Sequence, residues 1–351
     1  MLKKDTKLKR ILLVRTDRLG DLVLTTPAIK AVRGAYPDAH IAMIVRPYTE
    51  AVVKGNPYIN EVIVYDKLSR HRSWFANFKF AMGIRRMGFD AAVIFHPANR
   101  MHIAVFLAGI PRRIGYDNKL GFLLTDAVKN TKRLGIKHER DYAIDMLKLI
   151  GIGQGEKELF FNIDSFSKDR ARSILAAEGI KDGDRFVVMH PGASCPSKIW
   201  PSERFAGLAD TLIRNHGVKV VIVSGKAKTD ISCALSVQRS MHNDPAMFTG
   251  TLDLGCLGAV IRRSALFISN DSGPVHIAVA AGTPVVDIFG RAQPGLGPLR
   301  WGPLGARDVV IHKDLGCGQA CLAHDCKKNF ACLMSVSVDD VYRAIVSMGL
   351  F

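Results

Sequence analysis

The sequence predicts an α/β fold made of two doubly wound, Rossmann-like domains that face an interdomain cleft. Short apolar runs alternate with helix-like segments along the whole chain, which is typical of βαβ units and parallel sheets. The chain has 351 residues, 48% of them hydrophobic, which is enough for two sizeable cores. Several apolar runs end in polar turns, and open α/β sheets bind ligands at the carboxyl ends of their strands.

The amino-terminal domain is expected to span residues 1–165. Its apolar runs predict strands at Ile11–Val14, His40–Val45, Glu61–Tyr65, Asp90–Phe95 and Glu158–Ile163. Apolar residues at helical spacing predict helices at Asp21–Tyr36, Trp74–Met87, Arg100–Leu107 and Asp141–Ile150. A polar joint at residues 163–168 then leads into a new helix and the second domain.

The carboxyl-terminal domain, residues 166–351, repeats this alternation. Apolar runs predict strands at Phe186–Met189, Val218–Val223, Leu266–Ser269, Val285–Phe289 and Asp308–Ile311. Helices are expected at Ser202–His216, Asp230–Met241, Leu254–Arg263, Gly273–Ala281 and Val338–Val346. The last helix, over residues 338–348, is a candidate to pack back on the amino-terminal domain.

The turn at residues 270–276 (NDSGPVH) lies between a predicted strand and a short apolar helix. The free N–H groups and partial positive charge at a helix start favour a bound phosphate. The alternative is that Asp271 and Ser272 only cap the helix, without any ligand.

A second turn of this kind, residues 190–201 (HPGASCPSKIWP), follows another predicted strand. Gly192 lets the backbone approach an anion closely, and Lys198 can place a point charge on a phosphate. Two such turns together favour a diphosphate cradle over simple helix capping.

The first predicted strand ends in the turn at residues 15–21 (RTDRLGD). The G-x-G-x-x-G spacing of a dinucleotide site is absent there, and the chain has no Walker lysine motif. Asp21 can either cap the following helix or, at the mouth of the expected cleft, accept a proton from a substrate hydroxyl. Arg15 and Arg18 are natural partners for an anionic acceptor.

These three segments resemble, in order, the motifs of one enzyme family. Residues 15–21 are similar to its glycine–aspartate motif, residues 190–201 to its nucleotide-side loop, and residues 271–276 to its diphosphate loop. The family is that of the ADP-heptose:lipopolysaccharide heptosyltransferases, inverting glycosyltransferases of family nine with the GT-B fold. The resemblance runs from about Ile11 to the carboxyl terminus.

The resemblance implies roles for the matching residues. Asp21 corresponds to the general base and Lys198 to the phosphate-neutralising lysine, so both are expected to be catalytic. The donor-binding residues are expected to be Gly192, Ala193, Ser194, Asp271, Ser272, Gly273 and His276. Apart from the resemblance, Arg15 and Arg18 are acceptor-binding candidates, and residues 95–100 at another strand end add His96 and Arg100. The alternative is that His96 and Arg100 are only a loop histidine and a surface charge. Residues 224–230 (SGKAKTD), where the family carries an acidic residue that meets the nucleoside, depart from the pattern by two lysines.

The implied reaction is an inverting direct displacement without a required cofactor. An acceptor hydroxyl attacks the anomeric carbon of the donor, ADP-L-glycero-D-manno-heptose, and the nucleotide diphosphate leaves. The implied acceptor is phosphorylated lipid A–inner core of lipopolysaccharide. Three alternatives stay open. One is transfer from another nucleotide sugar, and the second is a NAD-dependent Rossmann oxidoreductase, which the missing glycine fingerprint disfavours. The third is a basic protein that binds nucleic acid or membrane without catalysis.

The net charge of +17 is distributed unevenly. Residues 1–165 carry 28 Lys and Arg against 16 Asp and Glu, whereas residues 166–351 carry 21 against 16. An anionic membrane surface suits this balance, and without a helix-turn-helix, zinc-finger or RNP signature we expect no nucleic acid partner. A generic basic surface is the alternative.

No apolar run approaches the roughly 18 residues of a membrane span, and the first is too short for the core of a signal peptide. We therefore expect a cytoplasmic, monomeric protein that is peripheral on the inner membrane's cytoplasmic face.

Four of the seven cysteines lie close together near the carboxyl terminus. They are Cys317, Cys321, Cys326 and Cys332. Their C-x3-C-x4-C-x5-C spacing is not that of a standard zinc knuckle, and a reducing cytoplasm disfavours disulfides. Free thiols, a zinc site and disulfides remain the three alternatives.

Overall fold

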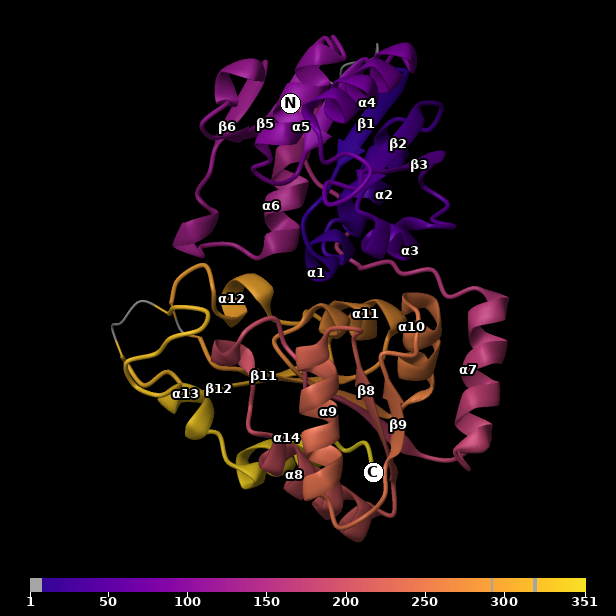
Figure 1. The fold of residues 1–351 in the computed structure, drawn as a ribbon, viewed down its shortest axis with the longest axis vertical. Helices are drawn as coiled ribbons and strands as arrows, with labels where there is room; N and C mark the ends of the chain where they lie inside the picture. Colours follow the sequence, from indigo (N-terminus) through magenta and orange to yellow (C-terminus); the bar gives the residue numbers. More distant parts are fainter. Residues whose placement is uncertain (1–7, 292, 318–320) are drawn as a thin grey trace. The chain divides into compact units, whose positions relative to one another are not determined.

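The structure, a computed structural model, describes residues 8–291, 293–317 and 321–351 (Figure 1). It divides into two compact units. Unit 1 contains the chain up to Arg133 together with Lys137–Asn162, and unit 2 contains Leu134–Ile136 together with Ile163–Phe351. Among the described residues, no helix combines the length and the apolar character that crossing a membrane requires.

Unit 1 is built on a parallel six-stranded sheet with the strand order β3-β2-β1-β4-β5-β6. The strands are β1 (Arg10–Val14), β2 (His40–Val45), β3 (Glu61–Val64), β4 (Ala91–Ile94), β5 (Arg112–Asp117) and β6 (Asp126–Lys129). The α-helices are α1 (Leu19–Val23), α2 (Thr26–Ala35), α3 (Glu50–Val53), α4 (Trp74–Arg86), α5 (Asn99–Leu107) and α6 (Glu139–Met146). Short 3-10 turns lie at η1 (Pro47–Thr49), η2 (Gly121–Leu123), η3 (Lys132–Leu134) and η4 (Leu147–Ile150).

The helix predicted over Asp21–Tyr36 is divided into α1 and α2, and a proline explains the division. Pro27 has no N–H to donate to the carbonyl of Val23. The hydroxyl of Thr26 takes its place and donates to that oxygen over 2.7 Å. The short α1 that results ends the turn after β1 and carries Asp21.

Two strands of unit 1 escape the sequence prediction, and one predicted strand is wrong. β5 and β6 are half-buried and largely polar, so they lack the apolar run by which buried strands are recognised. Residues 158–163 form no strand, because this segment lies along α2, where the N–H of Phe160 donates to the hydroxyl of Thr26 over 2.9 Å.

Unit 2 is built on a second parallel six-stranded sheet, with the order β12-β11-β10-β7-β8-β9. Its strands are β7 (Phe186–His190), β8 (Lys219–Ser224), β9 (Ala246–Thr249), β10 (Leu266–Asn270), β11 (Val285–Phe289) and β12 (Val309–His312). Its helices are α7 (Ser165–Ala177), η5 (Pro196–Lys198), α8 (Ser202–His216), α9 (Lys228–Ser240), α10 (Leu254–Arg263), α11 (Gly273–Ala281), α12 (Pro298–Trp301), α13 (Ala331–Met334) and α14 (Val338–Ser347). Only β9, a half-buried strand at the sheet edge, was not predicted among these strands.

The two sheets share one topology, which confirms the predicted doubly wound α/β fold. Numbered within its own unit, each sheet has the order 3-2-1-4-5-6. The order reverses between β1 and β4 in unit 1 and between β7 and β10 in unit 2. Ligands of open α/β sheets bind outside the carboxyl ends of the strands at such a switch point.

The final helix, α14, packs on unit 2, and its suggested placement on the amino-terminal domain stays a prediction. It contacts α8 and β12. Val341 and Ile345 on α14 are fully buried in the same apolar cluster as Trp200 and Phe205. The apolar face of the helix is therefore used within the core of unit 2.

Candidate active site

The two turns of unit 2 that the sequence singled out, at 190–201 and 270–276, are neighbours because β7 and β10 pair in parallel. Asn270 ties them together. Its side-chain oxygen accepts a hydrogen bond from the N–H of Trp200 over 3.0 Å, and its amide donates to the carbonyl of Pro191 over 2.6 Å. Since Asn270 and Trp200 are both fully buried, the turns hold each other in a fixed shape.

Lys198 and Asp271 form a buried ion pair across these turns. The Nζ atom of Lys198 lies 2.7 Å from Oδ2 of Asp271 and 3.4 Å from its carbonyl oxygen. The guanidinium of Arg291 lies 3.8 Å from the same Oδ2. Two cations thus share one carboxylate, which leaves a positive charge at the turn that suits an anion.

The start of α11 completes this cradle. Ser272 precedes the helix and makes no side-chain capping hydrogen bond to it, so its predicted alternative role as a cap is not realised. Its hydroxyl instead lies 3.0 Å from that of Ser269 and 3.3 Å from Nδ1 of His190. Burial lowers the pKa of His190 to about 4, so its ring is neutral at neutral pH. His276, also in the first turn of α11, is buried.

Gly192 leaves room for the carboxyl group of Asp230, which packs against it. A Cβ atom at Gly192 would lie 2.7 Å from Oδ1 of Asp230, and one at Gly225 would lie 2.7 Å from Oδ2. Asp230 therefore brings an acidic group from α9 to the turn after β7, despite the two lysines in its segment. Ala193 is buried beside Gly192, and Ser194 is exposed.

Asp287 on β11 is a second buried acid of unit 2, and sequence reasoning missed it. Neither carboxyl oxygen has a hydrogen-bond partner among the described residues. Burial, and next the charge of Asp271, raise its pKa well above the usual value. The fold therefore favours the neutral form of Asp287 over a wider pH range than that of a solvent-exposed carboxyl group.

In unit 1, Arg15 at the end of β1 is the centre of a buried charge network. Its Nη2 atom donates to Asp21 Oδ1 over 2.6 Å and to Glu139 Oε1 over 2.9 Å. Its Nε atom donates to Asp17 over 2.8 Å, and its Nη1 atom donates to the carbonyl of Phe95 over 3.0 Å. Burial alone would lower the pKa of Arg15, but the three carboxylates outweigh it and raise that pKa, so the guanidinium stays charged.

Asp21 is poised as a base by these surroundings. Burial, and next the charge of Asp17, raise its pKa to about 6, although Arg15 opposes the shift. A carboxyl group with a pKa near the working pH both accepts and releases a proton readily. The other predicted role of Asp21, capping α1, is not supported, since α1 has no side-chain capping hydrogen bond.

Lys132 also belongs to this network, because it contacts two of the partners of Arg15. Its Nζ atom lies 2.5 Å from Oε1 of Glu139 and donates to the carbonyl of Phe95 over 3.1 Å. It also lies 4.6 Å from the ring centre of Tyr116. Burial, and next the charge of Arg15, lower the pKa of Lys132 to about 8.

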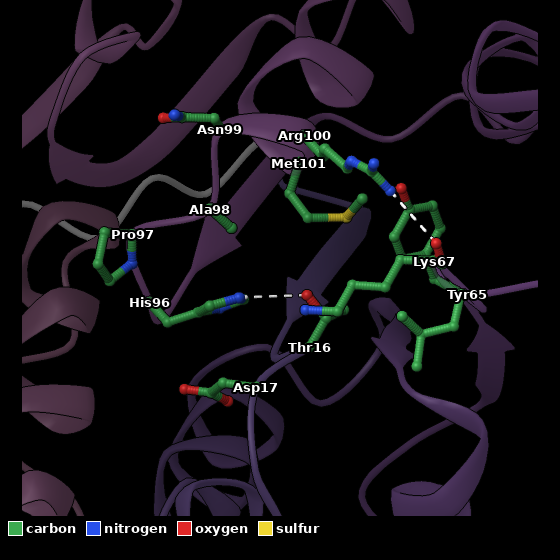
Figure 2. A pocket seen from close by; sticks show the side chains of 11 residues that line it. Thr16, Asp17, Tyr65, Lys67, His96, Pro97, Ala98, Asn99, Arg100 and Met101 are labelled. Carbon is green, nitrogen blue, oxygen red and sulfur yellow. Dashed lines mark hydrogen bonds between the residues drawn. The ribbon is translucent and has the colours of Figure 1, made fainter. Parts of the chain in front are cut away.

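A pocket of about 480 Å³ opens at the switch point of unit 1, between the ends of β1 and β4 (Figure 2). The lining residues are Thr16, Asp17, Tyr65, Lys67, Leu68, His96, Pro97, Ala98, Asn99, Arg100 and Met101. Two of the predicted acceptor-binding residues, His96 and Arg100, are among them. The pocket thus lies where the topology of the sheet places a ligand.

Lys67 and Arg100 supply the positive charge of this pocket, because His96 is neutral. Burial, and next the charge of Arg15, lower the pKa of His96 to about 3. Its Nε2 atom lies 3.1 Å from the hydroxyl of Thr16, and Nη1 of Arg100 donates to the carbonyl of Lys67 over 3.4 Å (Figure 2). A cationic rim over a neutral imidazole suits an anionic, hydroxyl-bearing ligand.

The other two acceptor candidates do not line the pocket. Arg18 is exposed on the turn before α1. Arg15 is only 1% exposed and its donors are directed at protein oxygens. Its geometry therefore disfavours the direct acceptor contact predicted for it.

The cysteine cluster does not form a metal centre in this structure. All seven cysteines are free thiols. Across the described ranges, no group of three or more His, Cys, Asp or Glu side chains is arranged to hold a metal ion. The zinc alternative for Cys317, Cys321, Cys326 and Cys332 is therefore not supported.

Comparison with known proteins identifies the family. The sequence model of the family described as glycosyltransferase family 9 (heptosyltransferase) matches residues 77–330, more than half of the chain. This chain belongs to glycosyltransferase family 9. It is thus a glycosyltransferase, and the oxidoreductase alternative falls away.

Individual relatives agree with the family. Lipopolysaccharide heptosyltransferase 3 of Escherichia coli is 27% identical over 281 residues, which is 78% of this chain and 81% of that protein. The crystal structure of a family 9 glycosyl transferase from Veillonella parvula is 28% identical, with a TM-score of 0.84 and 97% of both chains covered. The structure of the E. coli ADP-heptose heptosyltransferase II is 19% identical, with a TM-score of 0.78, and covers 97% of this chain and 98% of its own. These likenesses confirm the GT-B type of fold, with two Rossmann-like units.

Proposed function

We propose that this glycosyltransferase transfers a heptose from ADP-L-glycero-D-manno-heptose to the inner core of lipopolysaccharide by an inverting direct displacement. Lipopolysaccharide heptosyltransferases among the curated relatives support this choice of donor and acceptor. The observation that carries the proposal is the buried Asp21, whose pKa of about 6 suits a general base.

Asp21 takes the proton of the acceptor hydroxyl as that oxygen attacks the anomeric carbon of the donor. A new carbon–oxygen bond forms, the bond from the anomeric carbon to the diphosphate breaks, and the configuration inverts. Arg15 is a positioning residue in this step, because its Nη2 atom fixes Oδ1 of Asp21 at 2.6 Å. The other carboxylate oxygen is left to face the acceptor.

Lys198 stabilises the leaving diphosphate, on which negative charge accumulates as the bond breaks. Asp271 holds the lysine amino group in place, and the uncapped N–H groups at the start of α11 add further donors. We assign donor contacts to Gly192, Ala193, Ser194, Asp271, Ser272, Gly273 and His276. Asp230, next to Gly192, is a further candidate for the nucleoside end of the donor.

The acceptor, phosphorylated lipid A–inner core, is assigned to residues 1–165, and the donor to residues 166–351. His96 and Arg100 contact the acceptor from the pocket of unit 1, and Arg18 does so from the exposed turn nearby. The larger positive charge of residues 1–165 supports this division. We further propose a monomer that works in the cytoplasm, peripherally on the inner membrane.

The test is turnover with a panel of ADP, UDP, GDP and TDP sugars on heptose-deficient core acceptor, followed by analysis of the anomeric configuration of the product. We expect turnover only with the ADP-heptose and an inverted linkage. Turnover with a different nucleotide sugar would show that the proposed donor is wrong, while the assignment to the glycosyltransferase family would stand. A retained anomeric configuration would contradict the displacement mechanism.

A further inference from the structure

The segment that leads into α4 carries exposed aromatic residues, which a water-facing helix normally avoids. Trp74 is 76% exposed and Phe75 is 71% exposed, and Leu68 in the preceding turn is 70% exposed. Phe78 lies one helical turn after Trp74 and stacks on it, with ring centres 5.9 Å apart. Exposed apolar side chains gathered in this way mark an interaction surface.

Positive charge surrounds these side chains. Residues 67–89 contain six Lys or Arg residues and no Asp or Glu. Arg70, Arg72 and Lys79 are exposed beside the aromatic residues, and none of the three pairs with a carboxylate in the part of the chain that the structure describes. We call Leu68, Arg70, Arg72, Trp74, Phe75, Phe78 and Lys79 the aromatic–basic surface.

The backbone under this surface is held in one shape. The ring of His71 stacks on Tyr65 at 5.0 Å and packs on Phe80 at 4.8 Å. The side-chain amide of Asn77 donates to the carbonyls of His71 and Ser73 over 2.8 and 2.6 Å. The exposed rings are therefore presented by a fixed turn and helix start.

We propose that the aromatic–basic surface docks unit 1 on an anionic lipid bilayer. Tryptophan and phenylalanine favour the boundary between headgroups and acyl chains, and arginine and lysine around them favour anionic headgroups. The chemistry disfavours a second copy of this chain as occupant, because two surfaces with only positive charge would repel each other. Leu68 belongs to this surface and, like its neighbour Lys67, also lines the pocket of unit 1. Docking at this surface would therefore bring the pocket close to the bilayer, where a lipid-linked acceptor lies.

This inference rests on the proposed function in taking the acceptor to be lipid-linked, but its test needs neither donor nor acceptor. The full chain is sedimented with vesicles of phosphatidylglycerol and phosphatidylethanolamine, and with vesicles of phosphatidylcholine alone. We expect binding to the anionic vesicles and a blue shift of tryptophan fluorescence. Trp74 reports this shift, because Trp200 is fully buried and Trp301 is half-buried.

Three variants separate insertion from charge. Trp74→Ser/Phe75→Ser should weaken binding to anionic vesicles roughly tenfold or more, since two inserted rings are lost. Arg70→Gln/Arg72→Gln should weaken it by about fivefold for each charge and reduce its dependence on salt. Phe122→Ser/Phe166→Ser, which removes two rings of 79% and 73% exposure elsewhere, should bind as the wild type does.

Unchanged vesicle binding by Trp74→Ser/Phe75→Ser would overturn the proposal, as would equal binding to neutral vesicles. Conversion of a dimer to a monomer by this variant, seen by sedimentation velocity, would also overturn it and assign the surface to self-association. Turnover on a soluble, delipidated core saccharide keeps the two proposals separate. We expect the variant to turn over this acceptor as the wild type does and to fail only with acceptor in vesicles.

Discussion

The two units have the same sheet topology but different chemistry at their switch points. In unit 1, the end of β1 carries a buried network of three carboxylates around Arg15. In unit 2, the ends of β7 and β10 carry hydroxyls, glycine, and Lys198 paired with Asp271. Neighbouring carboxylates raise the pKa of a carboxyl group and make it a better base, as at Asp21. Neighbouring cations and free N–H groups instead favour the binding of an anion. The shared topology thus places a site in each unit, and the side chains decide which reacting atom it serves.

The comparison is tested most strongly by Asp21→Asn, which removes the base of unit 1 and keeps its shape. We expect kcat to fall on the order of 10²–10⁴-fold while donor affinity is retained. In the wild type, kcat/KM should rise with pH through about 6, because Asp21 must lose its proton to act. Asp38→Asn, at an exposed site in the same unit, is the matched control. Ordinary turnover by Asp21→Asn with an unchanged pH profile would remove Asp21 from the mechanism.

Lys198→Ala tests the other side of the comparison. Loss of one strong charge-stabilising donor costs about 3 kcal/mol, so kcat/KM should fall roughly 10²-fold. Both KM and kcat should suffer, because the lysine binds the donor and stabilises the departing diphosphate. Lys168→Ala, on the exposed face of α7, serves as control. Should donor affinity and kcat both survive, the diphosphate would have to bind elsewhere.

The sequence alone predicted the residues that directly follow the switch-point strands. The positions of Asp21 and Lys198 in the fold could be predicted, because each lies in the segment that follows a buried apolar run. Their roles in the reaction stay predictions. Glu139 and Asp287 could not be found in this way. Glu139 meets Arg15 across 124 positions of sequence. Asp287 lies inside an apolar strand, and its neighbours along the chain do not indicate that it lies close to the carboxyl group of Asp271, which follows β10.

Strand predictions failed for a related reason. β5, β6 and β9 are half-buried strands toward the sheet edges, so their sequences carry little of the apolar signal on which the prediction depends. The segment at residues 158–163 has that signal, but its apolar side chains Phe161 and Ile163 are buried outside the sheet. Burial can be inferred from an apolar run, whereas the surface against which the run is buried depends on tertiary contacts.

Glu139→Gln sharpens the account of unit 1 with a smaller effect. The charge of Glu139 raises the pKa of Asp21, so its removal should lower that pKa. It also leaves Arg15 to interact more strongly with Asp21, which acts in the same direction. The rising limb of the pH profile of kcat/KM should therefore move to lower pH, with a fall in kcat of roughly tenfold or less. A residue with only a structural role would change the free energy of unfolding and leave the limb in place.

Asp287→Asn should have the smallest effect on turnover, and its measurable effect is on stability. The pKa of Asp287 is raised in the folded protein above the usual value of about 3.9 for an unfolded chain. The folded state therefore holds a proton that the unfolded state releases, and the native carboxyl group costs stability as the pH rises above about 4.

Asparagine copies the neutral acid in shape and removes this cost. The variant should match the wild type in free energy of unfolding near pH 4 and exceed it at higher pH. Urea unfolding across this range measures the difference, with Asp244→Asn, an exposed acid of the same unit, as control. Parallel pH dependence in the variant and the wild type would show that Asp287 ionises normally in the fold. The contrast between an acid with a raised pKa beside the cations of unit 2 and a titrating base in unit 1 would then no longer hold.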